Sequence, residues 1–157
     1  MDLRIVIGAD HGGYPLKGPL KELVAGLGHQ VVDVGAHTND PLDDYPDFAK
    51  AVAEAIAHGE GDRGIVLCGS GVGAAVVANK VAGVRASVCH DTYSAKQGVE
   101  HDDMNVLCLG ARIIGDVTAK ELVTAFLSGK FLDQEKYRRR LNKVLAIEAA
   151  WAGRGRQ

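Results

Sequence analysis

The chain has 157 residues, of which 46% are hydrophobic and 24% are charged, and its formal net charge is −2 at pH 7. This size and composition are typical of one globular domain, which we expect to span residues 1–152, with residues 153–157 as a flexible tail. The slightly negative charge argues against a nucleic-acid or anionic-membrane partner, and no apolar run approaches the ~20 residues of a membrane-spanning helix.

The three cysteines, Cys68, Cys89 and Cys108, are an odd number, and each lies in or just after an apolar run. This usage predicts reduced thiols rather than a disulfide framework. The first residues enter a strand-like run directly and lack the layout of a signal peptide. We therefore expect a cytoplasmic protein.

Apolar runs alternate along the chain with segments of helical spacing. The runs predict strands at residues 3–7, 30–34, 65–67, 85–89 and 106–109. The remaining segments predict helices at residues 16–27, 47–58, 74–80, 92–100, 118–128 and 134–151. A capping box over residues 118–121 is expected to start the fifth of these helices. Strands that are short and apolar throughout are typical of a parallel sheet covered on both faces, so we predict an open, doubly wound α/β fold.

In such a fold the ligand site lies at the carboxyl ends of the strands. The polar or glycine-rich residues that follow predicted strands are Asp10, His11, residues 68–73, His90, Asp91 and Arg112. Asp10 is expected to accept from substrate hydroxyl groups and His11 to donate to a phosphate; the alternative is that the pair only caps the next helix. His101, predicted to lie between a helix and a strand, is suited to proton transfer near neutral pH, with a polar surface turn as the alternative. The wide spacing of the histidines and cysteines predicts no metal site.

The segment that begins at Cys68 is the main candidate for chemistry. It has the order strand, glycine-rich loop, helix, and the loop consists of Gly69, Ser70, Gly71, Val72 and Gly73. Such a loop points backbone N–H groups at one spot and favours an anion, although it matches no dinucleotide or P-loop motif. A thiol beside a helix N-terminus is typical of exposed, reactive cysteines. We interpret Cys68 as a proton-transfer group and Ser70 as a donor to an oxyanion; the alternative is a tight turn beside a buried cysteine.

The last predicted helix carries a basic cluster. Lys136, Arg140 and Lys143 are spaced to lie along one face, where together with Arg112 they can bind a phosphate. The alternatives are a solvated helix face or an RNA-binding surface.

Four ordered motifs extend over nearly the whole chain. They are GADHGG at residues 8–13, YPD at 45–47, CGSGVG at 68–73 with ANK at 78–80, and HDDMNVL at 101–107 followed by GAR at 110–112. With these motifs the chain resembles the type B ribose-5-phosphate isomerases, in the group that includes the galactose-6-phosphate isomerase subunits. The resemblance implies a Rossmann-like three-layer α/β/α sandwich with a five-stranded parallel sheet and no metal or cofactor. It also implies a homodimer or a dimer of dimers, with active sites shared between subunits.

Applied residue by residue, the resemblance makes Cys68 the base that moves a proton between C1 and C2 of a sugar, and His101 the residue that assists ring opening. The amides of residues 69–73 and the Ser70 hydroxyl stabilise the enediolate. Contacts with the substrate or its phosphate are implied for Asp10, His11, Tyr45, Asp102, Arg112, Lys136 and Arg140. A second branch of the family lacks the cysteine and has a glutamate where this chain has Ala74, so the chain is similar to the cysteine branch.

Three positions depart from the family pattern: Asp102 replaces the usual Asn, and Lys136 and Tyr137 replace an Arg-His pair. Lysine keeps the charge but loses the fork geometry that suits a phosphate. The predicted reaction is the interconversion of ribose 5-phosphate and ribulose 5-phosphate through a cis-enediolate. Allose 6-phosphate, galactose 6-phosphate and a four-carbon sugar phosphate stay open as substrates. A non-catalytic nucleotide- or RNA-binding module and a cysteine redox enzyme are the rivals from other classes, although no CxxC motif is present.

Overall fold

A computed structural model describes residues 1–154, and its strands form one five-stranded sheet. The strands are β1 (Arg4–Ala9), β2 (Gln30–Asp33), β3 (Arg63–Cys68), β4 (Ala86–Val88) and β5 (Val106–Gly110). They are all parallel and lie in the order β2-β1-β3-β5-β4, which makes β3 the central strand. Of the predicted tail, residues 155–157 lie outside the described part of the chain.

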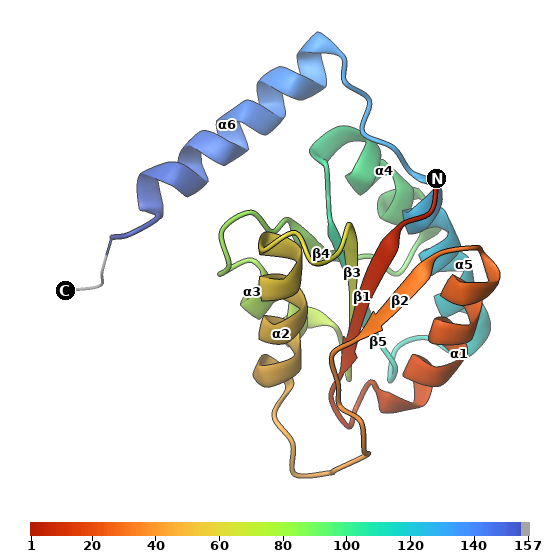
Figure 1. Ribbon diagram of the computed structural model, residues 1–157. Coiled ribbons are helices and arrows are strands. Elements are labelled where there is room, and N and C mark those ends of the chain that lie inside the picture. Colours follow the sequence, from red (N-terminus) through yellow and green to blue (C-terminus); the bar gives the residue numbers. More distant parts are fainter. Residues whose placement is uncertain (155–157) are drawn as a thin grey trace.

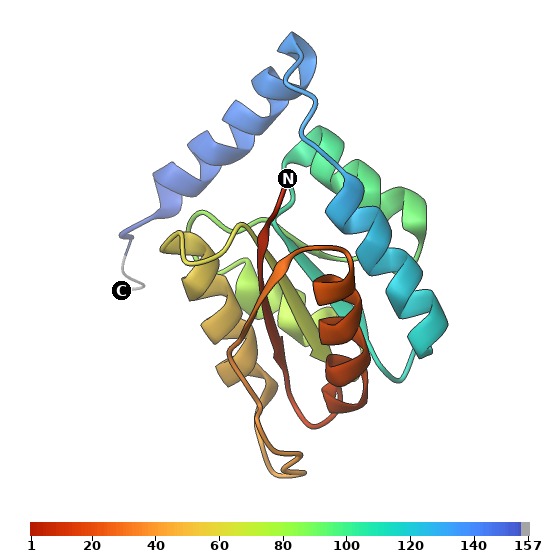
Figure 2. The same ribbon diagram turned by 45° about the vertical axis from the view of Figure 1, so that its right-hand side comes forward.

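Helices cover both faces of the sheet. Within residues 1–154 they are α1 (Tyr14–Gly26), α2 (Tyr45–Ala57), α3 (Val72–Ala78), α4 (Thr92–Asp102), α5 (Asp116–Ser128) and α6 (Glu135–Trp151). Helices α2 and α3 lie on one face, and α1, α4 and α5 lie on the other (Figure 1). Helix α6 extends away from these layers as an arm (Figure 2). The predicted Rossmann-like three-layer sandwich with a parallel sheet is confirmed.

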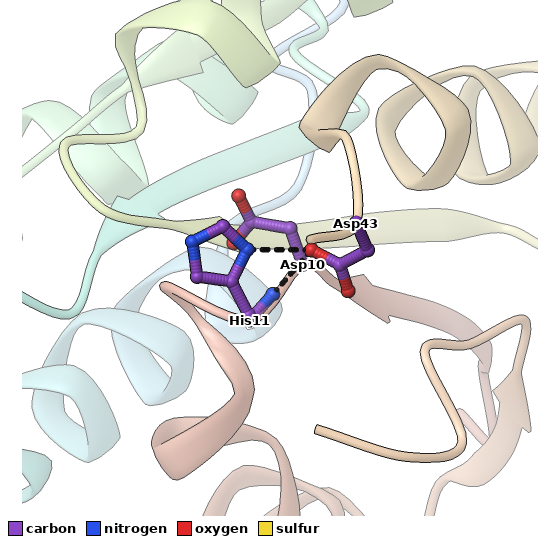
Figure 3. Close-up of side chains that lie close together, drawn as sticks. All are labelled: Asp10, His11 and Asp43. Atoms are coloured by element: carbon purple, nitrogen blue, oxygen red, sulfur yellow. Dashed lines mark hydrogen bonds and ion pairs between the residues drawn. The ribbon is translucent and has the colours of Figure 1, made fainter. Parts of the chain in front are cut away.

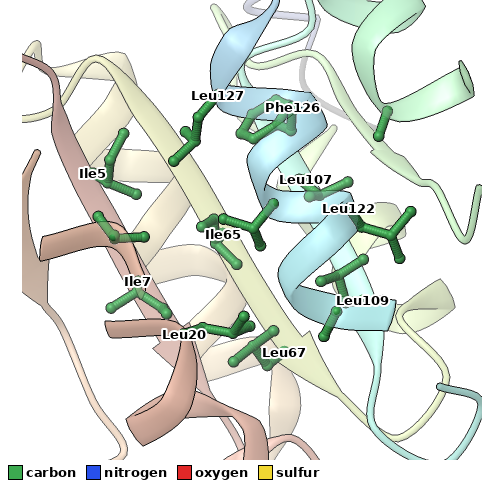
Figure 4. Close-up of a cluster of buried hydrophobic side chains, with 14 of the residues drawn as sticks. Ile5, Ile7, Leu20, Ile65, Leu67, Leu107, Leu109, Leu122, Phe126 and Leu127 are labelled. Carbon is green, nitrogen blue, oxygen red and sulfur yellow. The ribbon is translucent and has the colours of Figure 1, made fainter. Parts of the chain in front are cut away.

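Alternate side chains of the strands enter two separate cores, because successive side chains of a strand point to opposite faces. Large aliphatic side chains face α1, α4 and α5, as Figure 4 shows: Ile5, Ile7, Ile65, Leu67, Leu107 and Leu109. Smaller side chains face α2 and α3: Val6, Val66, Cys68, Val106 and Cys108. Cys89 and Cys108 are buried. Both faces of the strands are apolar because both are covered.

Most element boundaries differ from the sequence prediction by one to three residues, and for two of them the structure shows the reason. Helix α5 begins at Asp116 with Gly115 as its N-cap, so Thr118 lies inside the helix and the predicted capping box is wrong. The Ala119 amide donates to the Gly115 carbonyl oxygen at 3.0 Å, and this bond starts the helix earlier. Strand β3 begins at Arg63, before the apolar run, because Arg63 pairs with Ile5 of β1. No helix in the described chain is long and apolar enough to span a bilayer.

A partly buried ion-pair cluster joins the end of β2 to α1. Asp33 Oδ1 accepts a hydrogen bond from Lys17 Nζ at 2.9 Å, and Asp33 Oδ2 accepts one from Lys21 Nζ at 2.7 Å. Lys17 is only 6% exposed and also donates to the Ala36 carbonyl oxygen. Burial by itself raises the pKa of Asp33, but the hydrogen bonds from Lys21 and Lys17 outweigh it and lower the pKa to about 2. The cluster therefore stabilises the fold through a charged Asp33.

Acid is expected to destabilise the fold through Asp33. Its folded pKa of about 2 lies below the unfolded value of ~3.9. The stabilisation is therefore complete at pH values above the unfolded pKa and is lost as the pH falls toward 2. Asp33→Asn is expected to lower the free energy of unfolding by about 2 kcal/mol at pH 7 and to flatten its dependence on pH between ~4 and ~2. Urea unfolding at several pH values measures both effects, with Asp2→Asn as the control at an exposed carboxylate. An unchanged pH dependence in Asp33→Asn would contradict this assignment.

Candidate active site

A cavity of about 410 Å³ opens where β1 and β3 end side by side. It is lined by the ends of these strands, the start of α2 and the turn after β5: Asp10, His11, Gly12, Tyr45, Cys68, Gly69, Ser70, Gly73, Arg112 and Ile113. Eight of these residues are ones that the sequence marked for the site, and Gly71 and Val72 belong to the same loop. Gly12 and Ile113 were not predicted. The carboxyl edge of the sheet thus collects these residues in one place, as the fold class predicts.

Cys68 is the last residue of β3 and is only 5% exposed, so the prediction of an exposed thiol is wrong. The loop folds back over it, because Gly71 takes a left-handed conformation with φ of +82° that favours glycine. The Gly71 amide donates to Cys68 Sγ at 3.0 Å. The thiol is therefore held in one place at the wall of the cavity.

The loop uses two of its own amide donors internally. Besides the Gly71 amide, the Val72 amide donates to Ser70 Oγ at 3.2 Å. The sequence led us to expect that all the loop amides face a ligand, and for these two the structure shows an internal partner instead. Because the Ser70 oxygen accepts from Val72, its hydroxyl proton remains to be donated elsewhere.

Asp10 and His11 follow β1 and line the cavity. Figure 3 shows these two side chains together with Asp43. Asp10 is 6% exposed, and its Oδ1 accepts a hydrogen bond from the Gly13 amide at 2.9 Å, so it also caps the turn before α1. His11 binds Asp43 twice: its amide and its Nδ1 lie 2.9 and 2.6 Å from Asp43 Oδ1. The hydrogen bond to Asp43 raises the pKa of His11 above its ordinary value.

Sequence reasoning missed Asp43. It lies in a loop between β2 and α2 that also contains Asp40 and Asp44, and nothing in the sequence distinguishes the three. Together with Asp10 and His11 it brings oxygen and nitrogen atoms within 4.8 Å of one another, a spacing compatible with a cation. The Asp43 oxygen already accepts two hydrogen bonds from His11, so we assign the cluster to hydrogen bonding rather than to metal binding.

Two further side chains close the sides of the cavity. The Tyr45 ring lies over Gly73, since a Cβ atom at Gly73 would be 2.6 Å from Tyr45 Cε2. The Arg112 amide donates to the Gly69 carbonyl oxygen at 3.0 Å, and the Arg112 side chain lies against the same glycine. The cavity therefore combines a thiol, a hydroxyl, a carboxylate and two basic side chains.

His90 and Asp91 also follow a strand, but both serve the fold. His90 Nε2 accepts a hydrogen bond from the Gly110 amide at 3.1 Å. Asp91 is the N-cap of α4, and its Oδ1 accepts from the Ser94 amide at 2.7 Å. Their position at a strand end is therefore explained by local hydrogen bonding.

His101 lies far from Cys68 within the same chain. It belongs to the last turn of α4, so its predicted place between a helix and a strand is wrong. Helix α4 leads into the start of β5, whereas Cys68 pairs with Gly110 at the end of β5. The two residues are therefore at opposite edges of the sheet.

The His101 ring is held by two neighbours. Its Nδ1 lies 2.7 Å from the side-chain amide Nε2 of Gln97, one turn earlier in α4. Because an amide nitrogen only donates, Nδ1 is the acceptor and the neutral ring carries its proton on Nε2. The ring also stacks on Tyr137 of α6, with centroids 4.3 Å apart. The spacing of four residues between Gln97 and His101 is a signal in the sequence for this contact.

The other predicted phosphate and substrate residues also lie outside the cavity. Lys136 Nζ lies 4.7 Å from the Tyr137 ring centroid, and Arg140 is exposed on α6. Of their basic neighbours, Arg138 pairs with Asp133 and Arg139 pairs with Glu135. Asp102 is exposed and lines a second cavity, of about 830 Å³, between α6 and the region of β4. One chain thus separates the predicted site residues into two groups.

Comparison with known proteins shows which family the chain resembles. The sequence matches the Ribose/Galactose Isomerase family model over residues 5–144. It is 40% identical over 145 residues to ribose-5-phosphate isomerase B of Escherichia coli (strain K12), covering 92% of this chain and 96% of that protein. It is 43% identical over 132 residues to the D-erythrulose-4-phosphate isomerase of Pectobacterium atrosepticum, covering 82% of this chain and 85% of that protein.

Solved structures agree with the sequence match. Ribose-5-phosphate isomerase B of Mycoplasma genitalium, solved with bound ribulose-5-phosphate, superimposes with a TM-score of 0.87 at 37% sequence identity. The superposition covers 93% of this chain and 96% of that one. On the sequence match and the shared fold, the chain belongs to the Ribose/Galactose Isomerase family.

Proposed function

We propose that the protein is an aldose–ketose isomerase that interconverts ribose 5-phosphate and ribulose 5-phosphate. The observation that carries the proposal is the single cavity that joins the Cys68 thiol and the glycine loop to the basic side chains of His11 and Arg112. The names of two relatives, ribose-5-phosphate isomerase B of E. coli and of M. genitalium, support the same substrate.

The chemistry follows from the residues at the cavity wall. Cys68, as a thiolate, removes the proton from C2 of the open-chain aldose and returns it to C1, while a proton moves from O2 to O1. Amides of the loop and the Ser70 hydroxyl donate to the enediolate oxygens. Asp10 and Tyr45 bind the sugar hydroxyl groups. His11 and Arg112 hold the phosphate, whose binding orients the reacting carbons over the thiol.

The site is completed by a second copy of the chain. His101 and Arg140 lie outside the cavity of their own chain, so they reach a cavity only if they come from the partner. Helix α6 supports this arrangement, because it extends from the sandwich and exposes Val144, Ile147 and Trp151 at 49%, 63% and 67%. Exposed apolar side chains of this size are typical of a protein–protein interface. We infer a homodimer, or a dimer of dimers, working in the cytoplasm, where the free thiols of the chain stay reduced.

A panel of sugar phosphates tests the proposed substrate. The measurement is kcat/KM for aldose phosphates of four, five and six carbons, including allose 6-phosphate and galactose 6-phosphate. We expect ribose 5-phosphate to give the highest value. A four-carbon substrate is the second candidate, because a relative is named D-erythrulose-4-phosphate isomerase. Turnover of none of these sugars, together with salt-sensitive RNA binding, would favour a non-catalytic binding module.

Enlarging Gly73 is expected to displace Tyr45 without unfolding the protein. The added methyl group would lie 2.6 Å from the ring of an exposed side chain that can move. We expect Gly73→Ala to raise KM about tenfold through loss of one substrate contact, with a smaller change in kcat. Steady-state kinetics measure this, and Gly18→Ala is the control, since a Cβ there meets nothing within 4 Å. Strict additivity of Gly73→Ala and Tyr45→Ala in the double variant would contradict the coupling.

A further inference from the structure

His11 forms a close pair with Asp43, a residue that has no role in the chemistry proposed above. One oxygen of Asp43 accepts from both the backbone and the ring of His11, at 2.9 and 2.6 Å. The side chain of Asp43 is 10% exposed, whereas that of His11 is 32% exposed. The other Asp43 oxygen, Oδ2, is buried and has no hydrogen-bond partner within residues 1–154. Among the described residues, the Asp43 carboxylate therefore accepts side-chain and backbone hydrogen bonds from His11 only.

This contact decides which ring nitrogen carries a proton. A carboxylate only accepts hydrogen bonds, so Nδ1 of His11 must be protonated. In the neutral ring, Nε2 would then have a lone pair and could only accept. A phosphate dianion also offers only acceptors. His11 can therefore donate to a phosphate through Nε2 only when the ring is doubly protonated.

The charges around His11 favour that form. The hydrogen bond to Asp43 makes the largest contribution and raises the pKa of His11; the charges of Asp10 and Asp43 add to it. Partial burial and the charge of Arg112 act in the opposite direction, and the net shift is upward. The charged groups that act on the ring are thus Asp10, Asp43 and Arg112. A neutral side chain at position 43 would remove the largest contribution that stabilises the doubly protonated ring of His11.

We propose that Asp43 is a positioning residue for sugar-phosphate binding, which orients the His11 ring and keeps it in the doubly protonated form that donates to a phosphate oxygen. This proposal rests on the proposed function, in which His11 contacts the phosphate. Substrate binding then depends on pH: it weakens as the pH rises through the pKa of His11, and Asp43 sets where that occurs.

The test compares Asp43→Asn, which keeps the shape and removes the charge, with Asp43→Glu, which keeps the charge. The control is Asp44→Asn, at the exposed neighbouring carboxylate. The His11 ring is titrated by NMR in the substrate-free protein, with its signal assigned by its absence in His11→Gln. We expect a lower pKa in Asp43→Asn, a smaller change in Asp43→Glu and none in Asp44→Asn.

Kinetics and phosphate binding provide the functional readout. In Asp43→Asn the rise of KM for ribose 5-phosphate is expected to begin at lower pH. At pH values above the His11 pKa of both the wild type and the variant, each unit by which the substitution lowers this pKa raises KM about tenfold. The value of kcat is expected to change less than threefold, because Cys68 is untouched. Inorganic phosphate binding, followed by NMR or calorimetry, should weaken over the same pH range in Asp43→Asn.

The outcomes separate the two proposals. A wild-type protein that turns over no sugar phosphate, while its His11 titration still depends on Asp43, removes the proposed function and with it the role of Asp43 in substrate binding. Wild-type turnover with an unchanged His11 titration in Asp43→Asn overturns the inference about Asp43 and leaves the proposed function standing. Loss of kcat with an unchanged KM profile also overturns it. If Asp43→Asn fails to fold, Asp43→Glu and phosphate binding by the wild-type protein across pH carry the test.

Discussion

Cys68→Ala is expected to lower kcat for ribose 5-phosphate by about 10³-fold, because it removes the group that transfers the proton between C1 and C2. The substitution takes away one sulfur at the wall of the cavity and leaves the loop, Asp10 and the basic side chains in place. Binding should therefore be largely kept, with KM within a few-fold of wild type. The Cys68→Ala protein should also fail to exchange the sugar's C2 proton with solvent deuterium.

Cys108→Ala is the matched control. Cys108 lies on β5, beside β3, and is completely buried. Burial raises the pKa of the Cys108 thiol, so it stays protonated at neutral pH and has no access to a substrate. We expect this variant to lose about 1 kcal/mol of stability and to keep its kcat. Near-wild-type turnover by Cys68→Ala, or a loss of turnover in both variants, would remove Cys68 from its proposed role.

Two inactive variants are expected to restore activity when they are mixed, if the active site is shared between subunits. Cys68→Ala damages the cavity of its own chain, whereas His101→Asn damages the contribution that the chain makes to its partner. Each mixed dimer then contains one site with both residues intact and one site with neither. Random exchange of subunits should bring the mixture to about one quarter of wild-type activity, since half of the dimers are mixed.

A second mixture controls for nonspecific recovery. Cys68→Ala and Asp10→Asn both damage the same cavity, which a single chain provides. In a dimer of these two variants each site carries one defect, so no site is intact and no activity should return. Differently tagged subunits show that mixed dimers have formed. Mixed dimers of Cys68→Ala and His101→Asn without recovered activity would contradict a shared site.

The order of elements and most of the strand-end residues were predictable from the sequence. Apolar runs and helical spacing are local patterns, and they located the five strands and the helices of the described residues. Their ends were less predictable, because strand pairing extended β3 to Arg63 and a backbone hydrogen bond moved the start of α5 to Asp116. Pairing with a neighbour in space leaves no local pattern in the sequence.

The candidate active site around Cys68 also depends partly on local sequence and partly on tertiary contacts. By itself the sequence determined that a thiol, a glycine loop, Asp10, His11 and Arg112 follow parallel strands, and parallel strands bring their carboxyl ends to one edge. Only the tertiary structure decided that the loop covers the thiol and that Asp43, from a distant loop, holds His11. It also decided that His101 lies at the opposite edge, because a helix that follows a parallel strand must return to the edge where the next strand begins. These features depend on contacts between segments far apart in the chain, which residue spacing does not encode.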